Sequence, residues 1–155
     1  MSLESVRAFF AEKAPDIAVI ESPSSSATVA LAAEAYGVEP GRIAKTLSLR
    51  VGDRVVLIVA AGTSRMDNRK VKALFGVKPK MLGLDEVAAI TGHEVGGVCP
   101  FGLKTPLPVY CDVSLKAFDE VVPAAGSTHS AVRITPARMA ELVNAEWVDV
   151  CQHPS

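Results

Sequence analysis

The segment Gly96–Gly102 constrains the fold of this chain more than any other stretch, because it reads Gly-Gly-Val-Cys-Pro-Phe-Gly. Three glycines and one proline in seven positions exclude a helix interior and a central strand. Glycine also lets another group approach the main chain closely. A stiff loop of this kind can aim N–H groups outward, which is how proteins hold carbonyl oxygens, oxyanions and phosphates. A tight connection between two strands is the alternative that the loop alone leaves open.

Lys45 is a second candidate, and it lies in a segment with the alternation of a strand. In Ile43–Leu49 the odd positions share one face, which is aliphatic except for Lys45. Lysine is rarely buried without a partner, so either its stem reaches an edge or its ammonium enters a cavity that receives an anionic or polar group. Thr46 alternates to the opposite face and could act only at a strand edge.

A third candidate is the loop Ala124–Ser130, which reads Ala-Ala-Gly-Ser-Thr-His-Ser. It places the imidazole of His129 between two hydroxyl residues. Imidazole suits proton transfer near neutral pH, so His129 is a candidate for orienting a water molecule or an amino acid. An ordinary polar turn before a strand at 131–134 is the alternative.

The expected secondary structure mixes short strands with short helices. Strands are expected at 43–51 and 55–61, joined across Gly52-Asp53, and helices at about 28–36 and 68–75, each followed by a glycine. The elements show no regular alternation of strand and crossover helix, which favours an α+β fold over a doubly wound parallel sheet.

The lysine strand and the two loops, in this order, resemble the YbaK/EbsC-type aminoacyl-tRNA deacylases. These are free-standing relatives of the editing domain of bacterial prolyl-tRNA synthetases. The resemblance rests on an Ile-Ala-Lys-Thr-Leu strand, a Gly-x-x-x-Pro loop and a later loop with Ala-Gly, and it spans about residues 24–150. It implies an α+β fold in which short helices wrap a curved, barrel-like mixed sheet. It also implies that the chain deacylates mischarged tRNA, with proline tRNA carrying Ala, Ser, Cys or Thr as the expected substrate.

The resemblance also implies roles for site residues. An aminoacyl ester is already activated, so hydrolysis needs a placed water and a stabilised oxyanion rather than a strong nucleophile. Gly96 and Gly97 would supply main-chain N–H groups, Lys45 would contact the terminal phosphate or ribose, and His129 would handle a proton. The further substrate-binding candidates are Thr46, Val98, Cys99, Pro100, Phe101, Gly102, Gly126 and Ser127.

Two other functions stay open at this point. Cys99 stands where relatives often carry Ser or Thr, and it could be the nucleophile of a thiol hydrolase with His129 as its base, since loop N–H groups lower a thiol pKa. We favour the plainer interpretation of Cys99 as a small wall residue. A non-catalytic module that binds aminoacyl-tRNA or a synthetase would use the same loops and the same lysine.

Charge points to a local contact with nucleic acid. The net charge of the whole chain is −1, yet residues 65–80 hold six cations and one acid. Such a segment is typical of a phosphate contact or of a solvated helix face. With the resemblance, it is expected to contact the acceptor end of a tRNA. The candidates for this contact are Arg65, Arg69, Lys70 and Lys72. Prolyl-tRNA synthetase is a candidate partner, and DNA is not expected.

Composition and length are consistent with one domain over residues 1–155, since 155 residues with 49% hydrophobic content can bury a single substantial core. No apolar run approaches the roughly 20 residues that cross a membrane, and the start lacks the pattern of a secretory signal. Three cysteines without a CxxC pair argue against a disulfide framework and favour the cytoplasm. Histidines and cysteines lack ligand-like spacing, so neither a metal nor another cofactor is expected.

Overall fold

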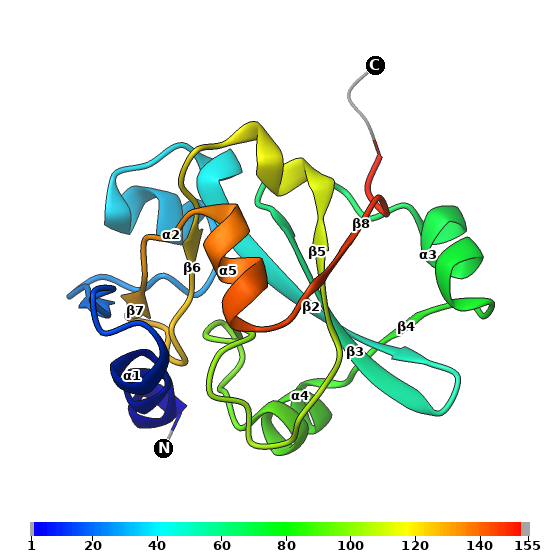
Figure 1. The fold of residues 1–155 in the computed structure, drawn as a ribbon, viewed down its shortest axis with the longest axis horizontal. Helices are drawn as coiled ribbons and strands as arrows, with labels where there is room; N and C mark the ends of the chain where they lie inside the picture. The colour runs from blue at the N-terminus through cyan, green and yellow to red at the C-terminus, as the bar shows by residue number, and fades with distance from the viewer. Residues whose placement is uncertain (1, 153–155) are drawn as a thin grey trace.

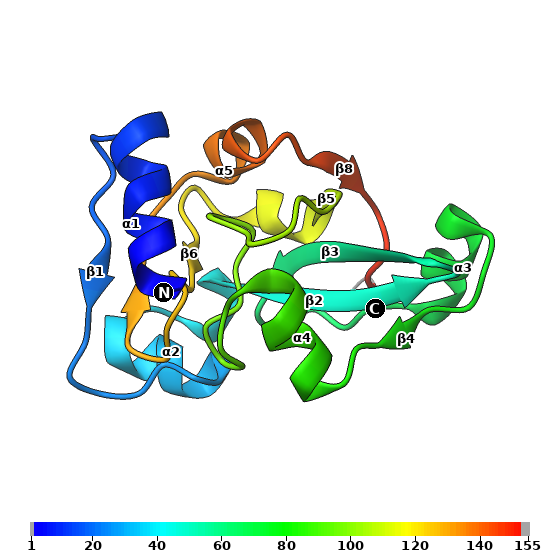
Figure 2. The same ribbon diagram turned by 90° about the horizontal axis from the view of Figure 1, so that it is seen from below.

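The computed structural model describes residues 2–152, and it shows an α+β fold built on a mixed sheet (Figures 1 and 2). The α-helices are α1 (Ser2–Lys13), α2 (Val29–Tyr36), α3 (Asn68–Phe75), α4 (Leu84–Thr91) and α5 (Pro136–Leu142), with short 3-10 helices at Pro40–Arg42 and Val113–Ala117. The strands are β1 (Ile20–Glu21), β2 (Ile43–Val51), β3 (Arg54–Ala61), β4 (Lys80–Met81), β5 (Val109–Asp112), β6 (Val122–Pro123), β7 (Ser130–Ala131) and β8 (Glu146–Val148). Across residues 2–152 no helix combines the length and the apolar character that crossing a bilayer requires.

Local sequence explains where the helices start and stop. The Thr28 hydroxyl accepts from the N–H of Leu31 and caps α2, which ends at the left-handed Gly37. The Asp67 carboxylate caps α3 in the same way, and α3 ends at the left-handed Gly76. The helices expected at 28–36 and 68–75 and the two long strands joined at Gly52-Asp53 are therefore confirmed.

The main sheet runs in the order β4-β2-β3-β5-β8, with β6 also paired to β2. The pairs β2–β3 and β2–β4 are antiparallel, and β3–β5, β5–β8 and β2–β6 are parallel, so the expected mixed sheet is confirmed. The barrel-like closure is not found, because β4 and β8 end the sheet without pairing to each other. β1 and β7 form a separate two-stranded sheet.

The two faces of the β2–β3 pair bury different cores. Residues that pair directly across an antiparallel ladder point to the same face. Thr46 pairs with Val59, which belongs to the large core that includes side chains of α1 and α5. Leu47 pairs with Ile58, which belongs to a smaller core that includes Val71 of α3. The helix α3 therefore lies on the face of β2 opposite to Thr46, and both ribbon views place it at the far end of the molecule from α1.

The outer edge of β2 is only partly covered. β6 pairs with it at Ile43 and Ala44, and β4 pairs with it at Leu49 and Arg50. The residues between these two short strands, 45–48, pair with β3 on one side and with no strand on the other, and at this outer edge the carbonyl of Ser48 accepts from the N–H of Leu82. This opening is where the cavity described below is found.

Glycines bring the segment Gly96–Gly102 into contact with distant parts of the chain. The N–H of Gly126 donates to the carbonyl of Gly97 at 3.0 Å. A Cβ added to Gly97 would lie 2.6 Å from the nitrogen of Ser127, and one on Gly102 would lie 2.7 Å from the carbonyl oxygen of Ser5 in α1. These glycines allow backbone to pack on backbone, so they determine how the loops and α1 meet.

Gly97→Ala should therefore be costly for stability, because its Cβ would collide with main-chain atoms that cannot rotate away. We expect the free energy of unfolding to fall by about 2–3 kcal/mol in urea titrations. Gly52→Ala is the matched control, since Gly52 has a positive φ but open space around it. The control should lose only about 1 kcal/mol from backbone strain. Equal losses in the two variants would show that the packing at Ser127 yields easily.

Candidate active site

A cavity of about 280 Å³ lies against the uncovered edge of β2. Its walls come from β2, from α2 and the residues before it, from the β4–α4 segment and from the two small-residue loops. Most of the lining side chains are small or aliphatic. The lining residues include Tyr36, Lys45, Thr46, Ser48, Leu84, Val95, Gly96, Val98 and Ser130.

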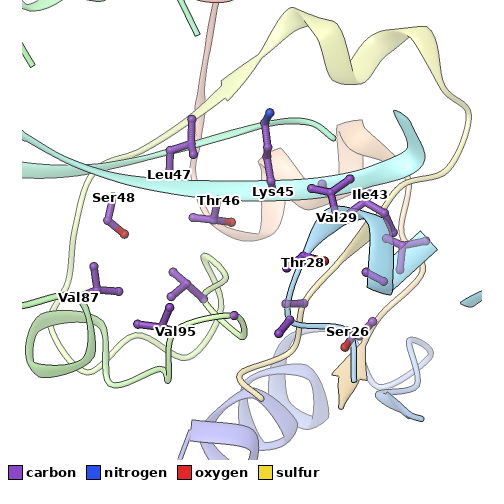
Figure 3. Close-up of a pocket in the computed structure, with 18 of the residues that line it drawn as sticks. Ser26, Thr28, Val29, Ile43, Lys45, Thr46, Leu47, Ser48, Val87 and Val95 are labelled. Carbon is purple, nitrogen blue, oxygen red and sulfur yellow. The ribbon is translucent and has the colours of Figure 1, made fainter. Parts of the chain in front are cut away.

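Strand alternation decides which side chains of β2 face the cavity. Figure 3 shows Thr46 and Ser48 on the side of the strand that faces Val87 and Val95, with Lys45 and Leu47 on the opposite side. The hydroxyl oxygen of Thr46 is buried and has no hydrogen-bond partner among residues 2–152. The same holds, within this part of the chain, for the phenol oxygen of Tyr36. Buried polar groups are normally paired, so these two hydroxyls suggest a site for a polar ligand.

The main chain of Thr46 adds a donor and an acceptor to this site. In an antiparallel ladder, residues alternate between those bonded to the partner strand and those whose N–H and C=O face the other edge. Ser48 faces the outer edge, because its carbonyl accepts from the N–H of Leu82 at 3.2 Å. Thr46, two residues earlier, has the same orientation, and it lies where neither β6 nor β4 reaches. Its N–H and C=O therefore face the cavity.

Lys45 lies in the same stretch of β2, but its ammonium is held on the opposite face. It donates to the carbonyl of Gly62 at 3.3 Å and to the carbonyl of Ser64. Burial lowers the pKa of this ammonium; the nearby Cys151 thiol counteracts that shift and Arg65 adds to it. The sequence-based role for Lys45, a contact with the substrate, would thus require its side chain to reach around the strand edge. Thr46 lies at an uncovered strand edge, which is the position that the sequence pattern required for a role in the site.

The loop Gly96–Gly102 contributes to the cavity only through its first residues. Gly96 and Val98 line the cavity, and so does the preceding Val95, which sequence reasoning missed. The N–H of Gly97 donates to the carbonyl of Glu94 at 2.9 Å, so this donor is already used within a turn. The remaining members of the loop, Cys99, Pro100, Phe101 and Gly102, are absent from the cavity wall, and the first three are buried. Their role is to anchor the loop.

Cys99 is buried in a packed polar cluster. Its sulfur lies 3.6 Å from Nε2 of His93 and 3.7 Å from the carbonyl oxygen of Phe101. Burial raises the pKa of the Cys99 thiol to about 12 and lowers the pKa of His93. Nε2 of His93 also donates to the Phe101 carbonyl at 2.7 Å. A fully buried, protonated thiol away from the cavity does not suit a nucleophile, so the thiol-hydrolase hypothesis is contradicted.

His129 is exposed and lies outside the cavity wall. Its Nδ1 is 3.2 Å from the carbonyl oxygen of Ser22. The neighbouring Ser127 is hydrogen bonded through its hydroxyl to Ser130 at 2.6 Å, and of these three residues only Ser130 lines the cavity. Gly126 serves the loop contact with Gly97 described above. This loop therefore presents Ser130 to the cavity rather than the imidazole that the sequence suggested.

The basic residues of the α3 region lie on the other face of the sheet from Thr46. Lys70 donates to Asp149 at 3.0 Å and to the carbonyl of Cys151 at 2.9 Å, so its charge is partly used within the fold. Arg65, Arg69 and Lys72 are exposed. None of these four residues lines the cavity.

The cavity is equipped to hold a small polar ligand. Its wall offers the hydroxyls of Thr46 and Ser48 and the main chain of an uncovered strand, and it includes no carboxylate and no imidazole among the described residues. Among residues 2–152 no three His, Cys, Asp or Glu side chains gather as a metal site would require. Such a wall can orient an ester and a water molecule through hydrogen bonds.

Comparison with known proteins identifies relatives over most of the chain. The family model of the aminoacyl-tRNA editing domain matches residues 23–142. YwhH of Bacillus subtilis (strain 168), an uncharacterized protein, is 51% identical over 154 residues, which cover 98% of this chain and 98% of YwhH. EbsC of Enterococcus faecalis, a candidate Cys-tRNA(Pro)/Cys-tRNA(Cys) deacylase, is 31% identical over 121 residues, which cover 76% of this chain and 73% of EbsC. A crystal structure of a candidate trans-editing enzyme for prolyl-tRNA synthetase matches with a TM-score of 0.91 and 32% identity, covering 98% of each chain.

The three cysteines should be unreactive in the folded protein. Cys99, Cys111 and Cys151 are buried, and burial raises the pKa of each thiol to about 12. At pH 8 only about one thiol in ten thousand would then be ionised. We expect iodoacetamide to leave the native protein unlabelled and to label the urea-unfolded protein three times, as read by mass spectrometry. Rapid labelling of Cys99 in the native state would reopen the thiol-hydrolase hypothesis.

Proposed function

The chain belongs to the aminoacyl-tRNA editing domain family, and on that premise we propose that it is a trans-editing deacylase, an ester hydrolase that removes a small amino acid from mischarged tRNA. Its substrate is the aminoacylated acceptor end of a tRNA. Residues 1–155 act in this proposal as one editing domain in the cytoplasm, where charged tRNA is used. Prolyl-tRNA synthetase is the partner that would produce the mischarged substrate.

The observation that carries this proposal is the uncovered stretch of β2 at Thr46. An aminoacyl ester has a carbonyl oxygen that accepts hydrogen bonds and an ammonium that donates them. The main-chain N–H and C=O of Thr46 face the cavity, with the unpartnered hydroxyl of the same residue beside them. Three hydrogen-bonding groups from one residue can therefore fix the ester at the strand edge.

In the mechanism that this geometry favours, the amino acid enters the cavity and the ester carbonyl accepts from the N–H of Thr46. Water attacks the carbonyl carbon and releases one proton to solvent, and the N–H stabilises the resulting oxyanion. As the oxyanion collapses, the bond between the carbonyl carbon and the terminal ribose oxygen breaks, and that oxygen takes up a proton from solvent. Stabilisation of an oxyanion by one hydrogen-bond donor is worth about 3 kcal/mol in known enzymes. Because the ester is activated, placement and this donor can suffice without a side-chain nucleophile.

Lys45 acts in the proposed mechanism as a positioning residue. Its two hydrogen bonds tie β2 to the 62–64 loop. Gly62 in turn packs closely on Val29 and on the carbonyl oxygens of Pro40 and Ile43, beside the cavity. We propose that the ammonium holds this end of the strand in register with the cavity. A direct contact with the terminal ribose or phosphate, which the resemblance implies, is the competing role.

The cavity accommodates a small amino acid. Its volume of about 280 Å³ can hold Ala, Ser, Cys or Thr, and its wall combines small residues such as Ala27 and Gly96 with larger ones such as Tyr36 and Leu82. Discrimination among side chains that differ by one methylene is worth only about 1–3 kcal/mol, so overlapping activity is expected. The names of EbsC and of the matching crystal structure support proline tRNA as the nucleic acid.

Turnover is the direct test of this function. We would incubate the protein with proline tRNA charged with Ala, Ser, Thr, Cys or Pro and follow release of the amino acid. Loss of one or more of the small amino acids, with prolyl-tRNA left intact, is the expected result. Tight binding of these tRNAs without any release would instead favour a non-catalytic binding module, which the same cavity could also serve.

Thr46→Val and Lys45→Met test the two faces of one strand. Thr46→Val keeps the side-chain shape and removes an unpartnered hydroxyl, so we expect kcat/KM to fall about tenfold with no loss of thermal stability. Lys45→Met removes two hydrogen bonds and should lower the melting temperature together with activity. The readouts are single-turnover deacylation and thermal unfolding.

The opposite pattern would assign the chemistry to the lysine. If Lys45→Met abolished deacylation at an unchanged melting temperature while Thr46→Val stayed fully active, the ammonium would have to reach the ester. Lys45→Arg separates the roles further, because a guanidinium can still bind two carbonyls and should preserve the melting temperature.

Tyr36→Phe tests whether the phenol hydroxyl helps the cavity to discriminate between amino acid side chains. The phenol oxygen is buried without a partner among the described residues, so its removal should leave stability unchanged or slightly higher. If this hydroxyl binds the polar end of the amino acid, kcat/KM for seryl-tRNA should fall about threefold to tenfold relative to alanyl-tRNA. An unchanged ratio would remove Tyr36 from the specificity pocket.

A further inference from the structure

Large apolar side chains are unusually exposed at one side of the cavity mouth. Leu84 and Val95 are 69% and 47% exposed, and both line the cavity. They come from the first turn of α4 and from the turn before Gly96. We call these two residues the apolar rim. Exposed apolar side chains that gather at a cavity mouth typically mark a contact surface for a ligand or a partner.

Positively charged side chains lie on the same face of the sheet, next to the apolar rim. Along β2 the cavity face carries Thr46, Ser48 and then Arg50, and Lys80 of β4 pairs directly with Arg50. At about 3.3 Å per residue, Arg50 follows Thr46 by roughly 13 Å. Lys78 precedes Lys80 in the same exposed segment. The order along this face is therefore hydroxyl groups, apolar rim and positive charge.

The carboxylates near these cations include Glu86, which already binds Arg50, and Asp85. Glu86 accepts from Arg50 at 2.7 Å and from the N–H of Gly83, and its hydrogen bond with Arg50 is the main reason that the pKa of this carboxyl is lowered. Asp85 is exposed beside it in the first turn of α4. Lys78 and Lys80 form no ion pair with any carboxylate of residues 2–152, so their charge is available to a phosphate.

We propose that the 3′-terminal single strand of the substrate tRNA crosses the apolar rim on its way into the cavity, with its last base on Leu84 and Val95 and its phosphates at Lys80 and Lys78. This inference rests on the proposed function and adds the route of the nucleic acid. A base has an apolar face, which suits the apolar rim, and its phosphate is anionic, which suits the adjoining cations.

This route excludes the α3 region from contact with the terminal nucleotides. Arg69 and Lys72 belong to a helix that packs on the opposite face of β2, against Leu49 and Ile58. A strand lying over Leu84 and Lys80 stays on the cavity face. The basic segment that the sequence singled out is thus divided by the sheet, and its last two lysines are the ones beside the cavity.

The experiment compares three variants of the full chain with wild type. The rim variant is Leu84→Ser with Val95→Ser, the lysine variant is Lys78→Ala with Lys80→Ala, and the α3 variant, Arg69→Ala with Lys72→Ala, is the matched control. Leu84→Ser alone is the reserve if the double rim variant fails to fold.

The substrates carry the amino acid identified by the charging panel, first as aminoacyl-tRNA and then as aminoacyl-adenosine, which keeps the base and lacks the phosphates. Binding of uncharged tRNA is followed by fluorescence anisotropy from 50 to 200 mM salt.

The rim variant should lower kcat/KM about tenfold on both substrates, because both present the terminal base. The lysine variant should lower kcat/KM on tRNA only and reduce the log–log salt slope of binding by about 0.7 for each phosphate that the protein no longer neutralises. The α3 variant should leave both the slope and the aminoacyl-adenosine rate at wild-type values.

Three results would overturn the route. Wild-type rates and slopes in the rim and lysine variants would do so, and so would a slope that falls in the α3 variant alone. A rim defect that appears only when prolyl-tRNA synthetase is present would mean that the rim docks a protein. If the wild-type protein releases no amino acid from any tRNA, the proposed function fails, while the anisotropy data still decide whether tRNA follows this path.

Discussion

The partial cover on the outer edge of β2 is the constraint on which the candidate site depends. A strand edge presents N–H and C=O groups that are costly to bury unpaired. β6 and β4 satisfy the two ends of this edge, and both are too short to reach Thr46. The cavity forms in that interval, walled by α2, α4 and the glycine loop. A ligand that enters it meets hydrogen-bonding groups that the sheet has left without partners.

Close backbone contacts at glycines hold the wall opposite this edge. Gly97 packs on Ser127 and Gly102 packs on α1, at distances that no side chain would allow. Behind the loop, Cys99 and Phe101 are fully buried in the main core, and His93 bonds to the Phe101 carbonyl. The most distinctive motif of the sequence therefore works mainly as an anchor. It fixes Gly96 and Val98 across from Thr46, and only these two of its members line the cavity.

The sheet also separates positive charge from the cavity. Hydroxyl groups of β2 face the cavity, whereas the Lys45 ammonium and the α3 cations lie on the other face. An amino acid that enters the cavity would meet dipoles rather than full charges, which suits a neutral ester carbonyl that becomes an oxyanion only in the transition state. Positive charge returns at Lys80 and Lys78, farther along the same face, where a nucleic acid backbone would lie.

Local sequence determined much of the fold and the family. The caps at Thr28 and Asp67, the glycines after the helices and the Gly52-Asp53 hairpin are short-range signals, because each depends on neighbours within a few residues. Motif order was enough to indicate an editing domain. Sequence alternation also placed Lys45 and Thr46 on opposite faces, but it could not say which face meets the cavity.

Contacts between distant segments decided which face of β2 meets the cavity. They also decided which motif residues line the cavity and which anchor the loops. Sheet pairing turned the Thr46 side chain toward the cavity and the Lys45 side chain away from it, packing buried Cys99 beside His93 rather than His129, and the sheet divided the basic segment between its two faces. The strand interval left open by β6 and β4 depends on residues more than 70 positions apart in the case of Ala44 and Pro123. No local pattern encodes such a gap, because it arises from where two short strands stop.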